Sequence, residues 1–162
     1  MNEALGEAFE EMKRADHLIY VSLKYTRTVD VIRSIVERLA TAYEKAITAL
    51  LEEAKNQKKI QSYSKNVGIK CKELQALYKD RPDILNEIEF FLLLRKILRS
   101  EYKKVEEYRR HVTMIVQFSP RETLNIDIDR IKEYYDRADA FIQKVAEMCG
   151  GAVRPNYYDD YF

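Results

Sequence analysis

The 162-residue chain is poor in the residues that interrupt regular structure, with only four glycines and three prolines. Its two cysteines, Cys71 and Cys149, are too few for a disulfide framework, and its first residues do not form a signal-peptide pattern. A net charge of +1 leaves no overall field that attracts nucleic acid or an anionic membrane. The low content of glycine, proline and cysteine excludes a fibrous protein and a small protein stabilised by disulfides. It also predicts reduced thiols and a cytoplasmic location.

Long apolar runs are missing as well. The densest run is 90–94, far short of the roughly 20 residues that a membrane span needs. We therefore expect no membrane partner. Hydrophobic residues still make up 46% of the chain, so they are expected in a buried core.

Apolar residues recur every three to four positions through most of the sequence, which is the spacing of amphipathic helices. The pattern predicts helices over about 2–24, 28–54, 60–79, 82–105 and 128–149. Gly68 makes the third of these shorter or broken, because glycine costs roughly 1 kcal/mol relative to alanine inside a helix. Between the last two, β-branched residues over 112–118 and alternation over 124–128 predict a short β-hairpin.

The expected fold is all-α, an antiparallel bundle of four to five helices with a short β-hairpin before the last helix. We expect residues 1–151 to form one helical-bundle domain and residues 152–162 to form a flexible aromatic and acidic tail, either frayed or docked on a basic surface. An unpaired edge of the strand over 112–118 is a template for another chain. The sequence therefore predicts a homodimer.

Residues that serve known catalytic and metal sites are scarce. The only histidines are His17 and His111, neither in a Glu-x-x-His spacing, and the two cysteines form no Cys-x-x-Cys. The chain also lacks a glycine-rich phosphate loop and a Gly-x-Ser-x-Gly turn. We expect no metal, no cofactor and no catalytic residue of these types.

Two charged residues occupy positions where the helical pattern predicts apolar ones. Asp16 lies in the middle of the first apolar stripe, and Arg95 lies in the stripe of the fourth helix. A buried charge without a partner is costly, so we expect Asp16 and Arg95 to pair. The pair is either a structural ion pair that fixes helix register or the floor of a ligand site.

A group of polar residues surrounds Asp16 at the junction of the first two helices. Backbone amides at a new helix N-terminus bind anions, so the group could hold a phosphate. Its members are His17, Tyr20, Tyr25, Arg27 and Asp30. The alternative for His17 is an exposed helix residue, and for the turn it is ordinary capping.

A second group, which we call the lysine strip, carries eight basic side chains. Its members are Lys55, Lys58, Lys59, Lys65, Lys70, Lys72, Lys79 and Arg81. With Glu73 and Asp80 the segment has a net charge of +6. Tyr63 and Tyr78 are interleaved, so phosphate contacts together with base stacking on single-stranded RNA are conceivable. The alternative is a solvated surface.

The segments Arg14–Tyr20 and Lys24–Asp30 resemble a group of small archaeal helical proteins related to the HEPN superfamily of four-helix domains. HEPN enzymes are metal-independent RNases, usually dimers, whose site uses Arg-x(4–6)-His. Here the residues five to seven positions before the two histidines are 10–12 and 104–106, and none is arginine. The resemblance therefore implies a binding member of the superfamily and assigns no catalytic residue.

Three functions stay open from the sequence. The first is a noncatalytic HEPN-like binding or assembly module, a homodimer that recognises RNA or a nucleotide phosphate. The second is a divergent metal-independent RNase that uses His17, Asp16 and Arg27. The third is a purely protein-binding helical scaffold.

Overall fold

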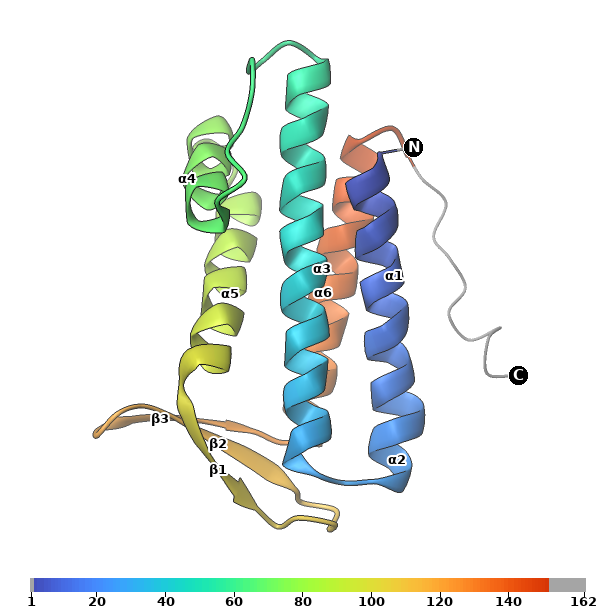
Figure 1. Cartoon of the computed structure of the whole chain (residues 1–162), viewed down its shortest axis with the longest axis vertical. Helices are drawn as coiled ribbons and strands as arrows, with labels where there is room; N and C mark the ends of the chain where they lie inside the picture. Colours follow the sequence, from blue (N-terminus) through green and yellow to red (C-terminus); the bar gives the residue numbers. More distant parts are fainter. Residues whose placement is uncertain (1, 152–162) are drawn as a thin grey trace.

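The computed structural model describes residues 2–151 and is mostly helical, with a small antiparallel sheet before the last helix (Figure 1). The elements in chain order are α1 (Glu3–His17), the π-helical turn η1 (Leu18–Ser22), α2 (Leu23–Tyr25), α3 (Val29–Asn56), α4 (Val67–Leu77), α5 (Pro82–Arg99), β1 (Glu101–Val105), β2 (Thr113–Ser119), β3 (Glu122–Ile126) and α6 (Ile128–Met148). This order confirms a helical fold with strands just before the last helix.

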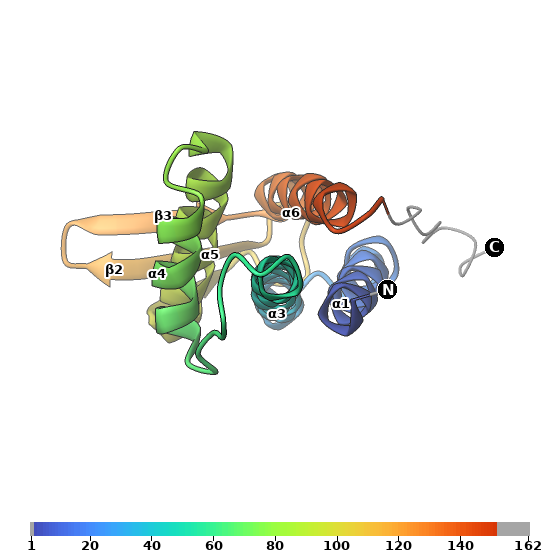
Figure 2. The same ribbon diagram turned by 90° about the horizontal axis from the view of Figure 1, so that it is seen from above.

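Helix α3 is the centre of the bundle. Seen from above, it lies between α1 on one side and α4 and α5 on the other, with α6 beside it (Figure 2). The three-stranded sheet lies at one end of the bundle, next to the start of α3 (Figure 1). Its strand order is β1-β2-β3, and both pairings are antiparallel.

A stack of aromatic rings joins three helices in the core. Tyr43 of α3 is fully buried, and its ring stacks on Phe141 of α6 at 5.0 Å and on Phe91 of α5 at 6.3 Å between centroids. Its hydroxyl donates a hydrogen bond to Glu87 Oε1 at 3.0 Å. Burial, reinforced by Glu87, raises the pKa of Tyr43 above its ordinary value, so the hydroxyl keeps its proton.

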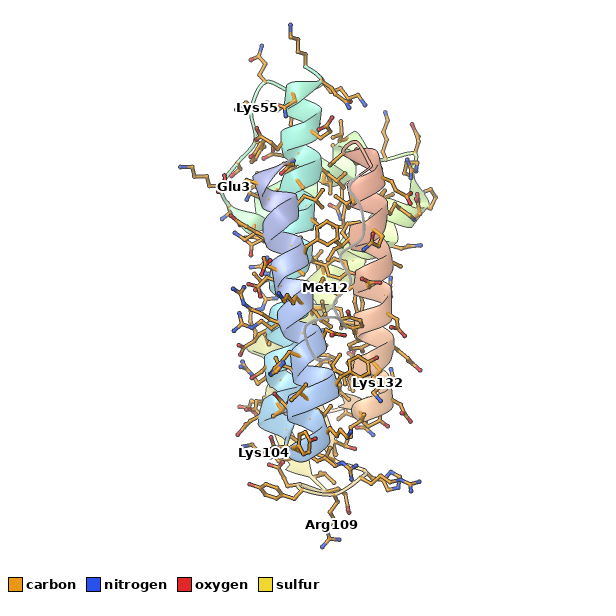
Figure 3. All side chains as sticks on the ribbon, turned by 90° about the vertical axis from the view of Figure 1, so that its right-hand side faces the viewer. Glu3, Met12, Lys55, Lys104, Arg109 and Lys132 are labelled. Atoms are coloured by element: carbon orange, nitrogen blue, oxygen red, sulfur yellow. The ribbon has the colours of Figure 1, made fainter. Side chains whose placement is uncertain are left out.

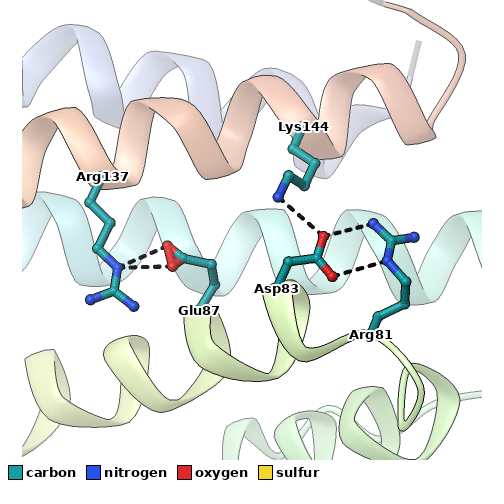
Figure 4. Close-up of polar contacts among 5 residues, drawn as sticks. All are labelled: Arg81, Asp83, Glu87, Arg137 and Lys144. Atoms are coloured by element: carbon teal, nitrogen blue, oxygen red, sulfur yellow. Dashed lines mark hydrogen bonds and ion pairs between the residues drawn. The ribbon is translucent and has the colours of Figure 1, made fainter.

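Ion pairs at the surface link α5 to α6 (Figure 4). Arg137 Nε donates to Glu87 at 2.9 Å, and Lys144 Nζ lies 3.2 Å from Asp83 Oδ2. The hydrogen bond from Arg81, with that from Lys144, lowers the pKa of Asp83. The pair of Lys144 and Asp83 is exposed and so contributes little stability, whereas the side chain of Glu87 is only 13% exposed.

The fourth predicted helix, over 82–105, is longer than the helix in the structure. Helix α5 ends at Arg99, Ser100 takes an extended backbone, and Glu101–Val105 forms β1. Tyr102 and Val105 continue a helical stripe, but Tyr102 lies opposite Val116 in a strand ladder instead. Pairing with β2 thus decides the conformation of this segment, because its local pattern fits a helix and a strand equally well.

The predicted hairpin exists as β2 and β3, but it belongs to a larger sheet. Strand β2 pairs with β1 on one side and β3 on the other. The prediction that β2 offers a free edge to a second chain is therefore wrong. The free edges are those of β1 and β3, and β1 carries charged residues, which discourage edge-to-edge pairing.

The first and third predicted helices also differ in detail. The first contains the π-helical turn η1, where the Leu23 amide donates to the Leu18 carbonyl five residues before it. The third begins only at Val67, capped by the side chain of Asn66, so Gly68 sits in its first turn. The expectation of a shorter third helix is confirmed.

No helix within residues 2–151 has both the length and the apolar character that crossing a membrane requires. The predicted tail, residues 152–162, lies outside the described residues.

Candidate functional site

Asp16 and Arg95 do not meet. Asp16 is fully buried, as predicted, on the α1 side of the bundle, but α5 carries Arg95 on the opposite side of α3 (Figure 2). Arg95 is half-buried, and its guanidinium lies 5.8 Å from the centroid of the Phe91 ring. The predicted ion pair is therefore wrong, because α3 separates the two stripes.

The other helix residues of the predicted phosphate group face the surface. His17 is exposed, and Tyr20 is 38% exposed in the π-helical turn. The Lys132 ammonium of α6 lies 5.7 Å from the centroid of the Tyr20 ring. Tyr20 therefore lies next to the first turns of α6.

The N-terminus of α3 already holds an anion, and it comes from this chain. The Val29 amide donates to the Glu107 carboxylate at 2.9 Å, and the Val31 amide donates to Thr28 Oγ1 at 3.3 Å. Asp30 forms an ion pair with Lys104 of β1 at 3.0 Å. The amides expected to bind a phosphate thus cap the helix, and a carboxylate of the β1–β2 loop sits at its positive end.

The same loop holds an exposed tyrosine in an unusual backbone conformation. Tyr108 has φ 66°, a left-handed value that costs a residue other than glycine roughly 1–2 kcal/mol. Its amide donates to the Arg27 carbonyl at 2.7 Å. This bond and the Glu107 contact fix the loop against the turn that joins α2 to α3. The Tyr108 ring remains 76% exposed.

A second exposed ring lies on the adjoining turn. Tyr25 is 78% exposed, and the Lys24 ammonium lies 5.9 Å from its centroid. We call this surface the tyrosine end; its members are Lys24, Tyr25, Arg27, Tyr108, Arg109 and Arg110. Figure 3 places Arg109 at the end of the molecule opposite Lys55 of the lysine strip.

The lysine strip has exposed cations but no exposed tyrosine. Its basic side chains are exposed except Lys70, which donates to Thr48 Oγ1 at 3.0 Å. Tyr63 donates its hydroxyl proton to Glu52 at 2.7 Å, and this hydrogen bond raises the pKa of Tyr63 to about 12. Tyr63 and Tyr78 pack against the core. The strip can therefore contact phosphates, but its two rings are not presented for stacking.

A cavity of about 820 Å³ lies near the N-terminus of α1 and the middle and C-terminal half of α3. Glu3, Glu7 and Glu44 line it, together with Glu52 and Glu53, whereas Lys45 and Lys70 are its cations among the described residues. Lys45 forms an ion pair with Glu7 at 2.8 Å. An excess of carboxylates repels phosphates, so this cavity does not fit the ligand that the sequence suggests.

Sequence reasoning missed Tyr108, Arg109 and Arg110. They follow a segment interpreted as helix, and only the sheet brings them to Arg27. The sequence did contain one signal, a tyrosine beside two arginines at 108–110. Within residues 2–151, no cluster of three or more metal-ligating side chains is present.

Comparison with protein-family models, with curated proteins and with solved structures finds no match for the chain. The HEPN resemblance is neither supported nor opposed by these comparisons.

Proposed function

We propose that this protein is a noncatalytic RNA-binding module that holds single-stranded RNA at the tyrosine end. One observation carries the proposal: the exposed rings of Tyr25 and Tyr108 lie on two segments joined by the Tyr108–Arg27 hydrogen bond. Large aromatic side chains usually bury most of their surface, so two exposed rings in one region mark a contact surface.

The chemistry of the tyrosine end matches that of single-stranded nucleic acid. Unpaired bases expose faces that stack on tyrosine rings, each worth about 1–3 kcal/mol. Lys24, Arg27, Arg109 and Arg110 provide cations for the phosphates beside them. Bases in a duplex are already stacked on one another, so the proposal favours single strands.

The loop is held in place before RNA arrives. Glu107 and the Tyr108 amide both bond to the segment around the start of α3. A surface fixed in advance loses less conformational entropy on binding. The left-handed backbone of Tyr108 supports the same interpretation, because strain of this kind gathers at functional sites.

The test is fluorescence anisotropy with a short labelled oligouridine RNA. We expect the Tyr25→Ala/Tyr108→Ala variant to lose at least about tenfold in affinity, since two stacked bases are lost. The matched control is Lys55→Gln/Lys58→Gln/Lys59→Gln in the lysine strip, which should keep most of the affinity. If the lysine variant loses binding and the tyrosine variant keeps it, the tyrosine end is not the site.

Burial weighs against the RNase alternative. Asp16 is fully buried, so its carboxylate does not reach a substrate on the surface, although His17 is exposed. Incubation with mixed RNA in a chelator tests this point. Cleavage that His17→Ala abolishes would favour the enzyme and, with it, a closer HEPN relationship; binding without cleavage favours the module. Neither binding nor cleavage favours a protein-binding scaffold.

Self-association is a separate proposal that rests on the free edge of β3. Light scattering should give a mass of twice 19.2 kDa if two chains associate. A mass of one chain at micromolar concentration contradicts the homodimer but leaves RNA binding unaffected.

A further inference from the structure

A small pocket opens beside the tyrosine end, at the π-helical turn. It has a volume of about 180 Å³, and the apolar side chains of Ile19, Leu23 and Ile128 line it. Ligand pockets for drug-sized molecules are typically about 300–1,000 Å³. This one therefore fits a single terminal group of a larger ligand.

The charged side chains of this pocket all have the same sign. Lys24, Arg27 and Lys132 line it, and no carboxylate is among its lining residues in the described part of the chain. This contrasts with the cavity of about 820 Å³, among whose lining residues glutamates outnumber lysines. Three cations around an apolar floor favour a ligand that carries more than one negative charge.

The π-helical turn contributes Ile19 and Tyr20 to the lining of this pocket. The Leu23 amide bonds to the Leu18 carbonyl, so the turn holds one more residue than an α-helical turn. Tyr20 and Lys24, four residues apart, both face the start of α6, where Lys132 lies over the Tyr20 ring. Bulges of this type occur frequently at functional sites.

The pocket and the tyrosine end share two residues. Lys24 lines the pocket and lies 5.9 Å from the Tyr25 centroid, and Arg27 lines the pocket and bonds through its carbonyl to Tyr108. An RNA strand stacked on the two tyrosines therefore has one end within reach of the cations.

We propose that this pocket binds the 5′-terminal phosphate of the RNA, so that the protein prefers 5′-monophosphorylated strands to 5′-hydroxyl strands. A terminal phosphate carries up to two negative charges and three oxygens, whereas a phosphate within a strand carries one charge. The two kinds of phosphate thus differ in negative charge, and a pocket with three cations favours the one with more charge. This inference rests on the proposed RNA binding and specifies which part of the RNA is recognised.

The experiment compares two oligouridine RNAs that differ only at the 5′ end, each labelled at its 3′ end. The wild-type chain should bind the 5′-phosphorylated strand about tenfold more tightly, since charge-assisted hydrogen bonds are involved. Lys132→Gln should bring this ratio close to one. The matched control, Arg130→Gln, removes the same charge from an exposed position two residues away on α6 and should keep the ratio.

The outcomes separate the two proposals. Equal binding of both strands by the wild-type chain overturns the phosphate pocket and leaves RNA binding at the tyrosine end standing. Absence of binding to either strand overturns both. Loss of the ratio in Arg130→Gln as well as Lys132→Gln also overturns the pocket, because the preference is then a general charge effect. Titration with adenosine monophosphate identifies the source of the phosphate: affinity equal to that of the phosphorylated RNA would make a free nucleotide the occupant and overturn the RNA assignment.

Discussion

The lysine strip and the tyrosine end lie at opposite ends of the bundle (Figure 3). The strip has the larger charge, +6 over residues 55–81, but Tyr63 and Tyr78 pack against the core there. The tyrosine end has fewer cations, and its two rings are the most exposed large hydrophobic side chains in the described chain. Charge alone would thus favour the lysine strip as the RNA-binding surface, whereas exposed aromatic rings favour the tyrosine end.

The comparison shows how one residue type serves two purposes. Tyr63 is fixed by its hydroxyl, which donates to Glu52, so its ring covers part of the core. Tyr108 is fixed by its backbone amide, so its side chain is left to solvent. The sequence contains a tyrosine near lysines or arginines in both cases, and only tertiary structure distinguishes them.

The strongest way to break the tyrosine end is Glu107→Ala. It removes a charge-assisted hydrogen bond from the Val29 amide, so we expect a loss of about 2 kcal/mol in the free energy of unfolding. RNA affinity should fall too, because the loop is no longer fixed in advance. Urea denaturation and anisotropy measure the two effects.

Glu106→Ala is the matched control for Glu107→Ala. Glu106 is exposed, and its closest cation, Arg109, is 3.9 Å away, so its loss should change stability by no more than about 0.5 kcal/mol. Equal losses in the two variants would show that Glu107 does not anchor the loop.

The salt dependence of RNA affinity also distinguishes the tyrosine end from the lysine strip. Each neutralised phosphate contributes about −0.7 to the slope of log affinity against log salt for a single strand. Arg109→Gln/Arg110→Gln should reduce the steepness by about 1.4, which is about a sevenfold difference in the salt effect between 50 and 200 mM. Lys58→Gln/Lys59→Gln should leave the slope unchanged. The reverse pattern would place the phosphate contacts in the lysine strip.

Both ends contain a residue with left-handed backbone, which permits a paired test with glycine. Tyr108 has φ 66° and Lys58 has φ 62°. Glycine adopts this conformation without strain, so Tyr108→Gly should be about 1 kcal/mol more stable than Tyr108→Ala, although both lose RNA affinity. Lys58→Gly should be more stable than Lys58→Ala by a similar amount and keep RNA affinity. Thermal melts that show no difference within either pair would mean that the backbone strain is absent in solution.

The smallest expected effect is at Tyr63, under alkaline conditions. Its hydrogen bond to Glu52 raises the pKa of Tyr63 from 10.0 to about 12, so the folded state holds this proton more tightly than the unfolded chain. That contribution is complete below pH 10 and is lost as pH rises towards 12. Tyr63→Phe should therefore lose less stability than the wild type over this interval, measured by urea denaturation. An identical pH dependence of the two proteins would contradict the hydrogen bond.

Helical periodicity predicted most of the fold, because α1, α3 and α6 bury one continuous stripe each. It failed at 101–105, where Tyr102 and Val105 suit a helix or a strand equally well and pairing with β2 decides. The burial of Asp16 followed from its phase on the helix, but its pairing with Arg95 did not. The spacing of apolar residues shows which face of each helix points into the core. It does not show which helices lie next to one another.

The candidate site was predictable only in part. Tyr25 and Arg27 belong to the turn that the sequence singled out, and they lie in the tyrosine end. Tyr108 and Lys132 could not be added from sequence, because they come from segments about 80 to 105 residues further on and their approach depends on the sheet and on α6. The π-helical turn has no sequence signature of its own.

The bond from the Val29 amide to Glu107 also has a consequence for biosynthesis. These residues are 78 positions apart, so most of α3 is synthesised well before Glu107, the carboxylate that accepts from its first amide. Two side chains, Thr28 and Glu107, accept hydrogen bonds from the first turn of α3. Until β1 and the loop after it have been synthesised, only Thr28 of these two is present. The arrival of the sheet then completes both the helix and the loop that carries Tyr108, so the end of the molecule that presents its rings is assembled late and as one unit.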